Sequence, residues 1–164
     1  CLACSHGGHL NEMLALREAF NGYETFYFCY DADTTRRLPR AYLAPNMAAN
    51  PLELLKNLVR VFRIFRQERP GLVLSTGAEI ALPVFAISKL FRIPFFYIEC
   101  GAQALHPSFT GRIMYWLADR FYVQWPELQA VYGRRALYRG SLIDEAPRPS
   151  GGAGSEPVRN HHFV

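Results

Sequence analysis

The sequence lacks any long apolar run. Crossing a bilayer takes about 20 consecutive apolar residues, and the longest apolar run here, residues 80–87, is far shorter and contains Pro83. The 164 residues therefore hold no segment that we predict to span a membrane. The chain starts without Met and inside an apparent strand, which leaves open an anchor in residues upstream.

Cysteine and lysine are both scarce. Four cysteines do not make a disulfide framework in a chain of this length. Cys1 and Cys4 have CxxC spacing, but no second ligand pair follows at zinc-site spacing, so no metal site is predicted. Lys56 and Lys89 are the only lysines, so the net charge of +4 rests on arginine, which binds phosphate through two-point contacts. This charge suits lipid, nucleic acid or a phosphorylated substrate equally.

Signatures of several protein classes are missing. The sequence has no GxGxxG dinucleotide fingerprint, no nucleophile elbow and no DxD-like carboxylate pair that would clearly hold a metal. These gaps disfavour a free-standing nucleotide-binding or hydrolytic domain. The arginines are dispersed and no nucleic-acid-binding motif accompanies them, so nucleic acid is not an expected partner.

Short β-rich runs alternate with helical patterns along most of the chain. Several of the strands are nearly continuous apolar runs, as a parallel sheet covered on both faces requires. The predicted strands are residues 1–4, 25–29, 72–75, 94–98, 120–124 and 136–138, and the predicted helices are residues 9–20, 51–67, 79–91, 109–117 and 126–132. This alternation predicts an α/β fold with a Rossmann-like parallel sheet and helices on both faces.

A single domain is expected at this length, because 164 residues are too few for two Rossmann-type domains. We predict that the domain covers residues 1–143. From residue 144 onward proline, glycine, serine and charged residues prevail, so residues 144–164 are predicted to form a disordered tail.

The junction between the first strand and the first helix, Ser5-His6-Gly7-Gly8-His9-Leu10, is the first candidate site. In open α/β sheets, ligands bind beyond the carboxyl ends of the strands. Gly7 and Gly8 allow a ligand to approach the backbone closely, and the N–H groups at a helix start attract an anion. His9 can bind a phosphate or accept a proton from a sugar hydroxyl. A tight turn that needs glycine is the simpler alternative.

Two more junctions lie at the same edge of the predicted sheet. Ser75-Thr76-Gly77-Ala78-Glu79 is a second small-residue loop before a helix, although ordinary capping accounts for it equally well. Glu99 follows the strand at residues 94–98 and is either a catalytic base or a structural acceptor for loop N–H groups. Ser108 is expected to cap the next helix.

The predicted helix at residues 51–67 follows an Asn50 cap and starts with Pro51. We predict that one apolar stripe faces the core; it consists of Leu52, Leu55, Val59, Phe62 and Phe65. Lys56, Arg60 and Arg63 form a basic stripe, and further apolar residues lie beside it. The helix therefore either contacts an anionic membrane surface or is buried on one side and solvated on the other.

Several segments together resemble a known family. They are Cys4-Ser5-His6-Gly7-Gly8-His9-Leu10, Asn50-Pro51-Leu52, Leu74-Ser75-Thr76-Gly77-Ala78-Glu79, Tyr97-Ile98-Glu99, Pro107-Ser108-Phe109-Thr110-Gly111, Asp119-Arg120-Phe121-Tyr122-Val123-Gln124-Trp125-Pro126 and Tyr138-Arg139-Gly140-Ser141. On these motifs the chain resembles bacterial PssD-type exopolysaccharide biosynthesis proteins. It is also similar to their eukaryotic relative, the membrane-anchoring subunit of the two-part UDP-GlcNAc transferase of dolichol-linked oligosaccharide synthesis. His6 departs from the small or polar residue that is more common there.

The resemblance implies the N-terminal, acceptor-binding half of a GT-B glycosyltransferase. A small separate subunit would bind the UDP-sugar donor, so this chain needs no cofactor of its own and transfers a hexose only in the complex. The acceptor would be a polyprenyl-diphosphate-linked saccharide. By the same resemblance, its diphosphate would contact Ser5, Gly7, Gly8, His9, Thr76 and Gly77.

Catalysis and location follow from the same resemblance. His9 or Glu99 would take the proton of the attacking hydroxyl in an inverting transfer, without a bound metal. The complex would work at the cytoplasmic face of the membrane. It would be held there either peripherally, through Lys56, Arg60 and Arg63, or by residues upstream of this chain. A scaffold that only anchors and stabilises a catalytic partner is the alternative function.

Overall fold

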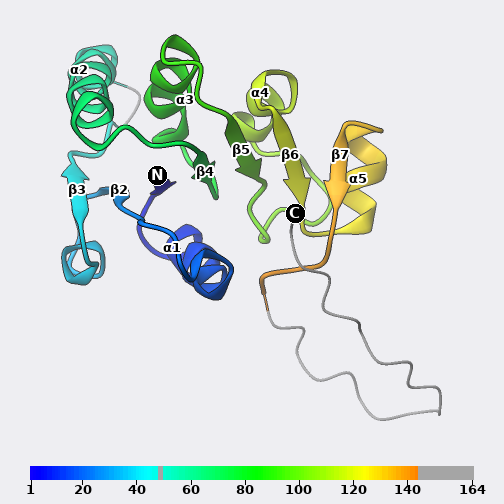
Figure 1. The fold of residues 1–164 in the computed structure, drawn as a ribbon. Coiled ribbons are helices and arrows are strands. Elements are labelled where there is room, and N and C mark those ends of the chain that lie inside the picture. Colours follow the sequence, from blue (N-terminus) through cyan, green and yellow to red (C-terminus); the bar gives the residue numbers. More distant parts are fainter. Residues whose placement is uncertain (48–49, 144–164) are drawn as a thin grey trace.

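Within residues 1–47 and 50–143, which the computed structural model describes, seven parallel strands form one sheet in the order β3-β2-β1-β4-β5-β6-β7 (Figure 1). The strands are β1 (Leu2–Cys4), β2 (Tyr27–Tyr30), β3 (Ala41–Ala44), β4 (Val73–Ser75), β5 (Phe95–Ile98), β6 (Arg120–Val123) and β7 (Ala136–Tyr138). The chain runs outward from β1 to β3 and then returns to β4 on the other side of β1, so the order reverses between β1 and β4.

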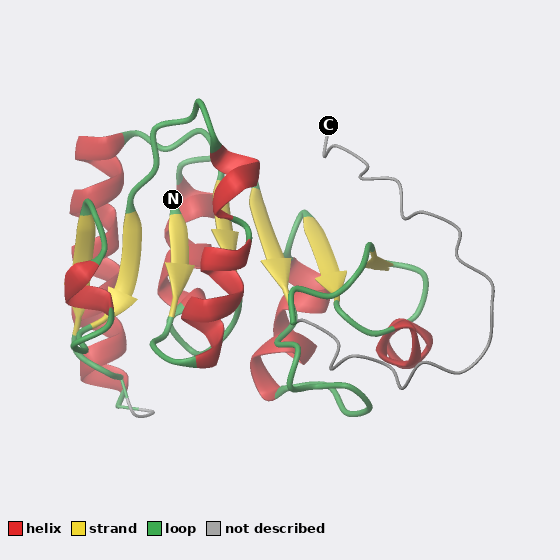
Figure 2. Cartoon of the chain, turned by 90° about the horizontal axis from the view of Figure 1, so that it is seen from below, coloured by secondary structure: helices red, strands yellow, loops and turns green. Residues whose placement is uncertain are grey.

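Helices cover both faces of the sheet, as Figures 1 and 2 show. The helices are α1 (Gly8–Ala15), α2 (Pro51–Glu68), α3 (Ala81–Leu90), α4 (Phe109–Leu117) and α5 (Pro126–Tyr132), with short 3-10 turns at Arg17–Phe20 and Thr35–Arg37. Buried residues of α2 to α5 share one core cluster, and Leu10 and Met13 of α1 belong to a second cluster on the opposite face. The predicted α/β, Rossmann-like fold is confirmed.

The main difference from the predicted elements is the edge strand β3. Its four residues are apolar but only partly buried apart from Ala44, and a run this short between Pro39 and Pro45 is not distinguished from a loop by its sequence. The predicted first helix also stops early, because α1 ends at Ala15 and a 3-10 turn follows. Helices α4 and α5 have the predicted bounds.

The predicted start of α2 is confirmed, because Asn50 Oδ1 accepts a hydrogen bond from the N–H of Leu52 at 2.9 Å. The predicted core stripe is wrong for three of its five residues. Leu52, Leu55 and Val59 are 65%, 58% and 45% exposed. The buried residues of this helix are Asn57, Val61, Ile64 and Phe65. Two apolar stripes run along α2, and periodicity alone does not say which one meets the sheet.

The chain's predicted tail, residues 144–164, lies outside the described residues. Across residues 1–47 and 50–143, none of the helices has both the length and the apolar character needed to cross a bilayer.

Candidate functional site

The reversal of strand order places two βα loops side by side. The loop between β1 and α1 and the loop between β4 and α3 both leave the carboxyl edge of the sheet, at neighbouring strands. In open α/β sheets such a switch point opens a crevice where ligands bind. The predicted site residues Ser5, Gly7, Gly8, His9, Thr76 and Gly77 all lie in these two loops or in the first turn of α1.

The first loop leaves the start of α1 open to a ligand. Gly7 has φ 73°, in the left-handed region that favours glycine, and no side chain caps the helix. The first backbone hydrogen bond of the helix runs from Asn11 N–H to the carbonyl of Gly7 at 3.1 Å. The N–H groups before Asn11 therefore have no partner within the helix, as is usual at a helix start. With Gly7 and Gly8 exposed, this N-terminus suits an anion.

His9 and Thr76 connect the two loops through a pair of hydrogen bonds. The Thr76 hydroxyl donates to the carbonyl of His9 at 2.7 Å, and His9 Nδ1 lies 2.7 Å from the carbonyl of Thr76. A carbonyl only accepts, so Nδ1 carries a proton and the neutral ring has its lone pair on Nε2. His9 is half-buried while Thr76 is fully buried. The ring is thus fixed in one orientation, and no hydrogen bond of Nε2 is seen within residues 1–47 and 50–143, so this nitrogen can accept a proton.

Gly77 lets the His9 ring lie against the second loop. A Cβ atom at Gly77 would come within 2.7 Å of Cε1 and 2.9 Å of Nδ1 of His9. Gly77 also has φ 120°, so a larger residue would be strained as well as obstructed. The close contact means that this glycine is needed for the position of the imidazole.

Glu12 is a site residue that the sequence analysis missed. It lies three residues after His9 on α1, a spacing that places two side chains on one side of a helix. Glu12 is 4% exposed, and burial raises the pKa of its carboxyl group above the ordinary value. Its Oε1 accepts hydrogen bonds from Gly101 N–H at 2.8 Å and from the Cys100 thiol at 3.5 Å. The spacing from His9 was the available signal, but it gives no warning of burial.

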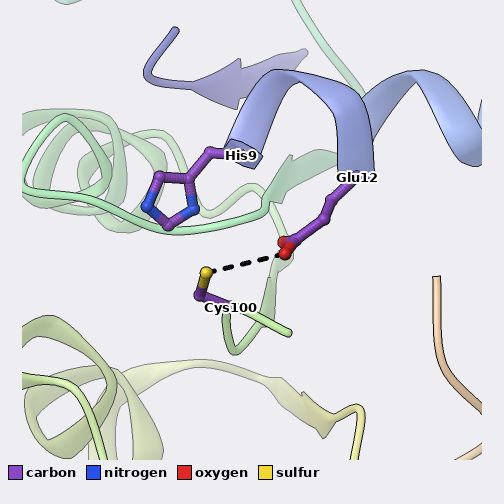
Figure 3. Close-up of side chains that lie close together, drawn as sticks. All are labelled: His9, Glu12 and Cys100. Carbon is purple, nitrogen blue, oxygen red and sulfur yellow. Dashed lines mark hydrogen bonds between the residues drawn. The ribbon is translucent and has the colours of Figure 1, made fainter. Parts of the chain in front are cut away.

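His9, Glu12 and Cys100 offer one nitrogen, one oxygen and one sulfur atom within 4.8 Å of one another (Figure 3). Zinc accepts all three atom types. A metal would also need the Cys100 sulfur as a thiolate, whereas burial raises the pKa of this thiol to about 11. Nδ1 of His9 carries the proton that it donates to the carbonyl of Thr76, so Nε2 is the nitrogen that remains for a ligand. The three groups can hold or move a proton as well as bind a metal.

Glu99 is fully buried beneath the start of α4. Its Oε1 accepts a hydrogen bond from Cys100 N–H at 3.1 Å, and its Oε2 accepts one from the hydroxyl of Tyr132. Burial and, to a smaller extent, this contact raise the pKa of Tyr132 well above the ordinary value. A Cβ atom at Gly111 would overlap Oε2 of Glu99, so α4 packs directly on this carboxylate. Both oxygens are engaged by the protein.

The outer surface of α2 combines apolar and basic side chains. A shallow groove there is lined by Tyr42, Leu43, Leu55, Lys56, Val59, Arg60, Arg63 and Ile64. Lys56 forms an ion pair with Glu53 at 2.6 Å, and the Arg60 guanidinium donates to the side-chain oxygen of the buried Asn57. Arg63 is exposed and has no ion-pair partner among the described residues. The predicted basic stripe therefore lies beside exposed leucine and valine side chains.

Comparison with known proteins gives a family match and a fold match. Residues 36–142 match the family described as "Oligosaccharide biosynthesis protein Alg14 like". The chain is 38% identical over 65 residues to the UDP-N-acetylglucosamine transferase subunit ALG14 of Saccharomyces cerevisiae, which covers 40% of this chain and 25% of that protein. It is 24% identical over 134 residues to the human subunit of the same name, covering 77% of this chain and 58% of the human one.

Among solved structures, MurG of Acinetobacter baumannii superposes with a TM-score of 0.68 at 18% sequence identity. The superposition covers 90% of this chain and 46% of MurG. At this identity the likeness supports the Rossmann-like fold alone. The chain spans a quarter of the yeast relative and somewhat over half of the human one.

Proposed function

Because the chain belongs to the Alg14-like family of oligosaccharide biosynthesis proteins, we propose that it is the acceptor-binding subunit of a two-part glycosyltransferase. The partner subunit binds a UDP-sugar, and the pair transfers the sugar to a saccharide linked to a lipid diphosphate. The yeast and human relatives are UDP-N-acetylglucosamine transferase subunits, which favours UDP-N-acetylglucosamine as the donor. An exopolysaccharide or a lipid-linked oligosaccharide is the product class.

The observation that carries this proposal is the open start of α1 at the switch point, beside a histidine whose Nε2 is free. Free N–H groups and the positive end of the helix suit a diphosphate. The exposed Gly7 and Gly8 and the half-buried His9 would contact this group, while the buried Thr76 and Gly77 hold the His9 ring in place.

The reaction that fits the site is an inverting transfer. The acceptor hydroxyl oxygen forms a bond to the anomeric carbon of the donor, the bond from that carbon to UDP breaks, and UDP leaves with the electron pair. The hydroxyl proton goes to Nε2 of His9. We favour His9 over Glu99 as the base because Glu99 is fully buried and both of its oxygens are engaged. Glu99 would instead hold the loop after β5 in place.

The surface of α2 fits a membrane-facing role for this subunit. Exposed Leu52, Leu55 and Val59 would enter the boundary between headgroups and acyl chains. Lys56, Arg60 and Arg63 would contact anionic lipid at the cytoplasmic face. Holding the subunit at the bilayer keeps the acceptor loops close to a lipid-linked substrate.

Reconstitution of sugar transfer tests the proposed function. Purified chain, purified partner from the neighbouring gene, and their mixture would be incubated with radiolabelled UDP-N-acetylglucosamine and a lipid extract. We expect labelled lipid only from the mixture. Transfer by this chain alone would contradict the two-part arrangement.

A His9→Ala variant separates catalysis from scaffolding in the same assay. We expect it to bind the partner normally and to lose transfer by about 100-fold or more, as removal of a general base commonly does. Full transfer by this variant would favour the non-catalytic scaffold instead.

A further inference from the structure

Glu12 lies beside the proposed base but has no part in the reaction described so far. Its Oε1 connects α1 to the loop after β5 through Gly101 N–H and the Cys100 thiol. That contact is structural, and an uncharged amide oxygen would accept the same hydrogen bond from Gly101. The connection between the two elements therefore does not explain why a carboxylate occupies this position.

The second carboxylate oxygen of Glu12 is only weakly compensated, because the Gln124 amide lowers the pKa of this carboxyl group by less than burial raises it. Among the described residues, Oε2 of Glu12 is buried and makes no hydrogen bond. A buried charge without a compensating group is unfavourable, so such a group usually serves a purpose. In Figure 3 the carboxylate extends from α1 toward the gap between the His9 ring and Cys100. The nearest ligand atoms of these three residues lie within 4.8 Å of one another.

The His9 ring is held in a way that matches this carboxylate. Thr76 fixes the proton on Nδ1, so a proton that arrives from a substrate binds at Nε2 and makes the ring cationic. At a separation of a few ångströms in a partly buried site, a carboxylate attracts that cation much more strongly than it would in water. The attraction is small before proton transfer, when the ring is neutral.

The other ionisable groups nearby do not supply this charge. Burial raises the pKa of the Cys100 thiol to about 11, and it raises the pKa of the Tyr97 hydroxyl well above its ordinary value, so both are neutral near pH 7. Glu99 directs its carboxylate to Cys100 N–H and Tyr132. Glu79 in the loop after β4 is exposed to solvent, so among the described residues Glu12 is the buried acidic side chain at this edge with an oxygen that makes no hydrogen bond.

We propose that Glu12 is a positioning residue for sugar transfer, whose buried carboxylate stabilises the cation that His9 becomes when Nε2 takes the acceptor proton. The inference rests on the proposed function and deepens it. The stabilisation is greater in the transition state than before it, because the charge on His9 develops during the reaction, and such differential stabilisation raises kcat. The burial that raises the pKa of Glu12 also keeps solvent from screening the interaction.

The test is a Glu12→Gln variant in the reconstituted pair. Glutamine has the same shape and its amide oxygen still accepts from Gly101 N–H, so the variant removes the charge and keeps the connection between the elements. We expect kcat to fall about 10-fold to 100-fold, with the KM for the lipid acceptor unchanged. A Glu18→Gln variant, which changes an exposed carboxylate on the same segment, is the matched control and should keep full activity.

A double-mutant cycle then shows whether Glu12 acts through His9. In the His9→Ala background, Glu12→Gln should cause no further loss of kcat, because the cation that Glu12 stabilises no longer forms. A purely structural role for Glu12 would lower kcat by the same factor in both backgrounds, and that result would overturn the inference.

Three other results would also overturn it. An unchanged kcat in Glu12→Gln, in a pair whose wild-type form transfers sugar, would contradict the inference while leaving the proposed function intact. Loss of transfer on EDTA treatment with recovery on adding Zn²⁺ would indicate that His9, Glu12 and Cys100 hold a metal instead. If the wild-type pair itself transfers no sugar, the proposed function fails and the inference fails with it.

Discussion

Helices α1 and α2 break the usual distribution of polar and apolar residues in opposite directions. Helix α1 buries a carboxylate, with Glu12 at 4% exposure, whereas α2 leaves Leu52 and Leu55 at 65% and 58% exposure. Charged side chains are rarely buried and exposed apolar residues seldom gather on one surface without a partner. Natural sequences depart from such rules mostly at functional sites, and a function is proposed here at each of the two helices.

The buried carboxylate of α1 and the exposed leucines of α2 differ in which groups offset their unfavourable surroundings. Glu12 is partly compensated inside the protein by Gly101 N–H, and the rest of its charge faces His9. The leucines of α2 find no such compensation inside the chain, so their proposed partner is a bilayer. Variants of α2 should therefore change binding to lipid without changing stability, whereas variants around the buried carboxylates should change stability or turnover.

Among the effects on lipid binding and stability, the largest is expected on the basic side of α2. An Arg63→Glu variant replaces an attraction to anionic lipid with a repulsion, and near a membrane each charge contributes about 1 kcal/mol. We expect binding to vesicles with anionic headgroups to weaken roughly 30-fold, measured by co-sedimentation at low salt. Arg134→Glu makes the same change of charge at an exposed position of the loop after α5 and should bind normally. Equal weakening in both variants would mean that only net charge matters.

The apolar side of α2 gives the next largest effect. Leu55→Ser removes a side chain whose burial is worth roughly 1.5 kcal/mol, so we expect about 10-fold weaker vesicle binding with no loss of thermal stability. Val131 of α5 is 57% exposed, close to the 58% of Leu55, and Val131→Ser is the matched control. A clear drop in the melting temperature of Leu55→Ser would contradict the exposed position and favour the core stripe predicted from the sequence.

The wrong stripe on α2 shows where sequence patterns stop being informative. Alternation of β and α patterns was enough to predict the fold, because the central strands are continuous apolar runs and most helices have a clear start, such as Asn50 before Pro51. Helix α2 has apolar residues on two sides. Its packing is decided by contacts with α3 and the sheet, including Phe62 and Phe65 against Phe91, and those contacts are not encoded in local periodicity.

The loop residues of the candidate site could be predicted from the sequence, but the burial of the two carboxylates beneath the loops could not. Gly7, Gly8 and His9 stood out because their composition at a βα junction is unusual, and the strand order brings Thr76 and Gly77 beside them. Glu12 did not stand out, since a glutamate within a helix is ordinary and its burial depends on the loop after β5. Similarly, the full burial of Glu99 depends on α4 and Tyr132, which are distant in sequence.

Glu99 is the second buried carboxylate near the site, and unlike Glu12 it accepts hydrogen bonds from the protein with both of its oxygens. Tyr132→Phe removes the hydroxyl that donates to Oε2 of Glu99 and leaves a buried acceptor unpaired. We expect the free energy of unfolding to fall by about 1 kcal/mol in urea titrations. Tyr115→Phe is the control, since its ring lies 5.1 Å from that of Tyr132, centroid to centroid, and no hydrogen bond of its hydroxyl is seen within the described residues. Equal losses in both variants would point to ring packing in place of the hydrogen bond.

The smallest expected effect is the pH dependence that Glu12 gives to stability. Burial raises the pKa of Glu12 above its ordinary value of 4.5, so the folded chain holds this proton more strongly than the unfolded chain. The resulting stabilisation is complete below pH 4.5 and is lost as the pH rises through the folded pKa. Glu12→Gln has no such proton to lose, so its stability relative to wild type should increase between pH 4.5 and pH 7.5 in urea titrations. A relative stability of Glu12→Gln that falls over this range would mean that the ionised carboxylate stabilises the fold. In that case α1 would no longer contrast with α2, because its buried charge would be a structural feature that needs no reaction to explain it.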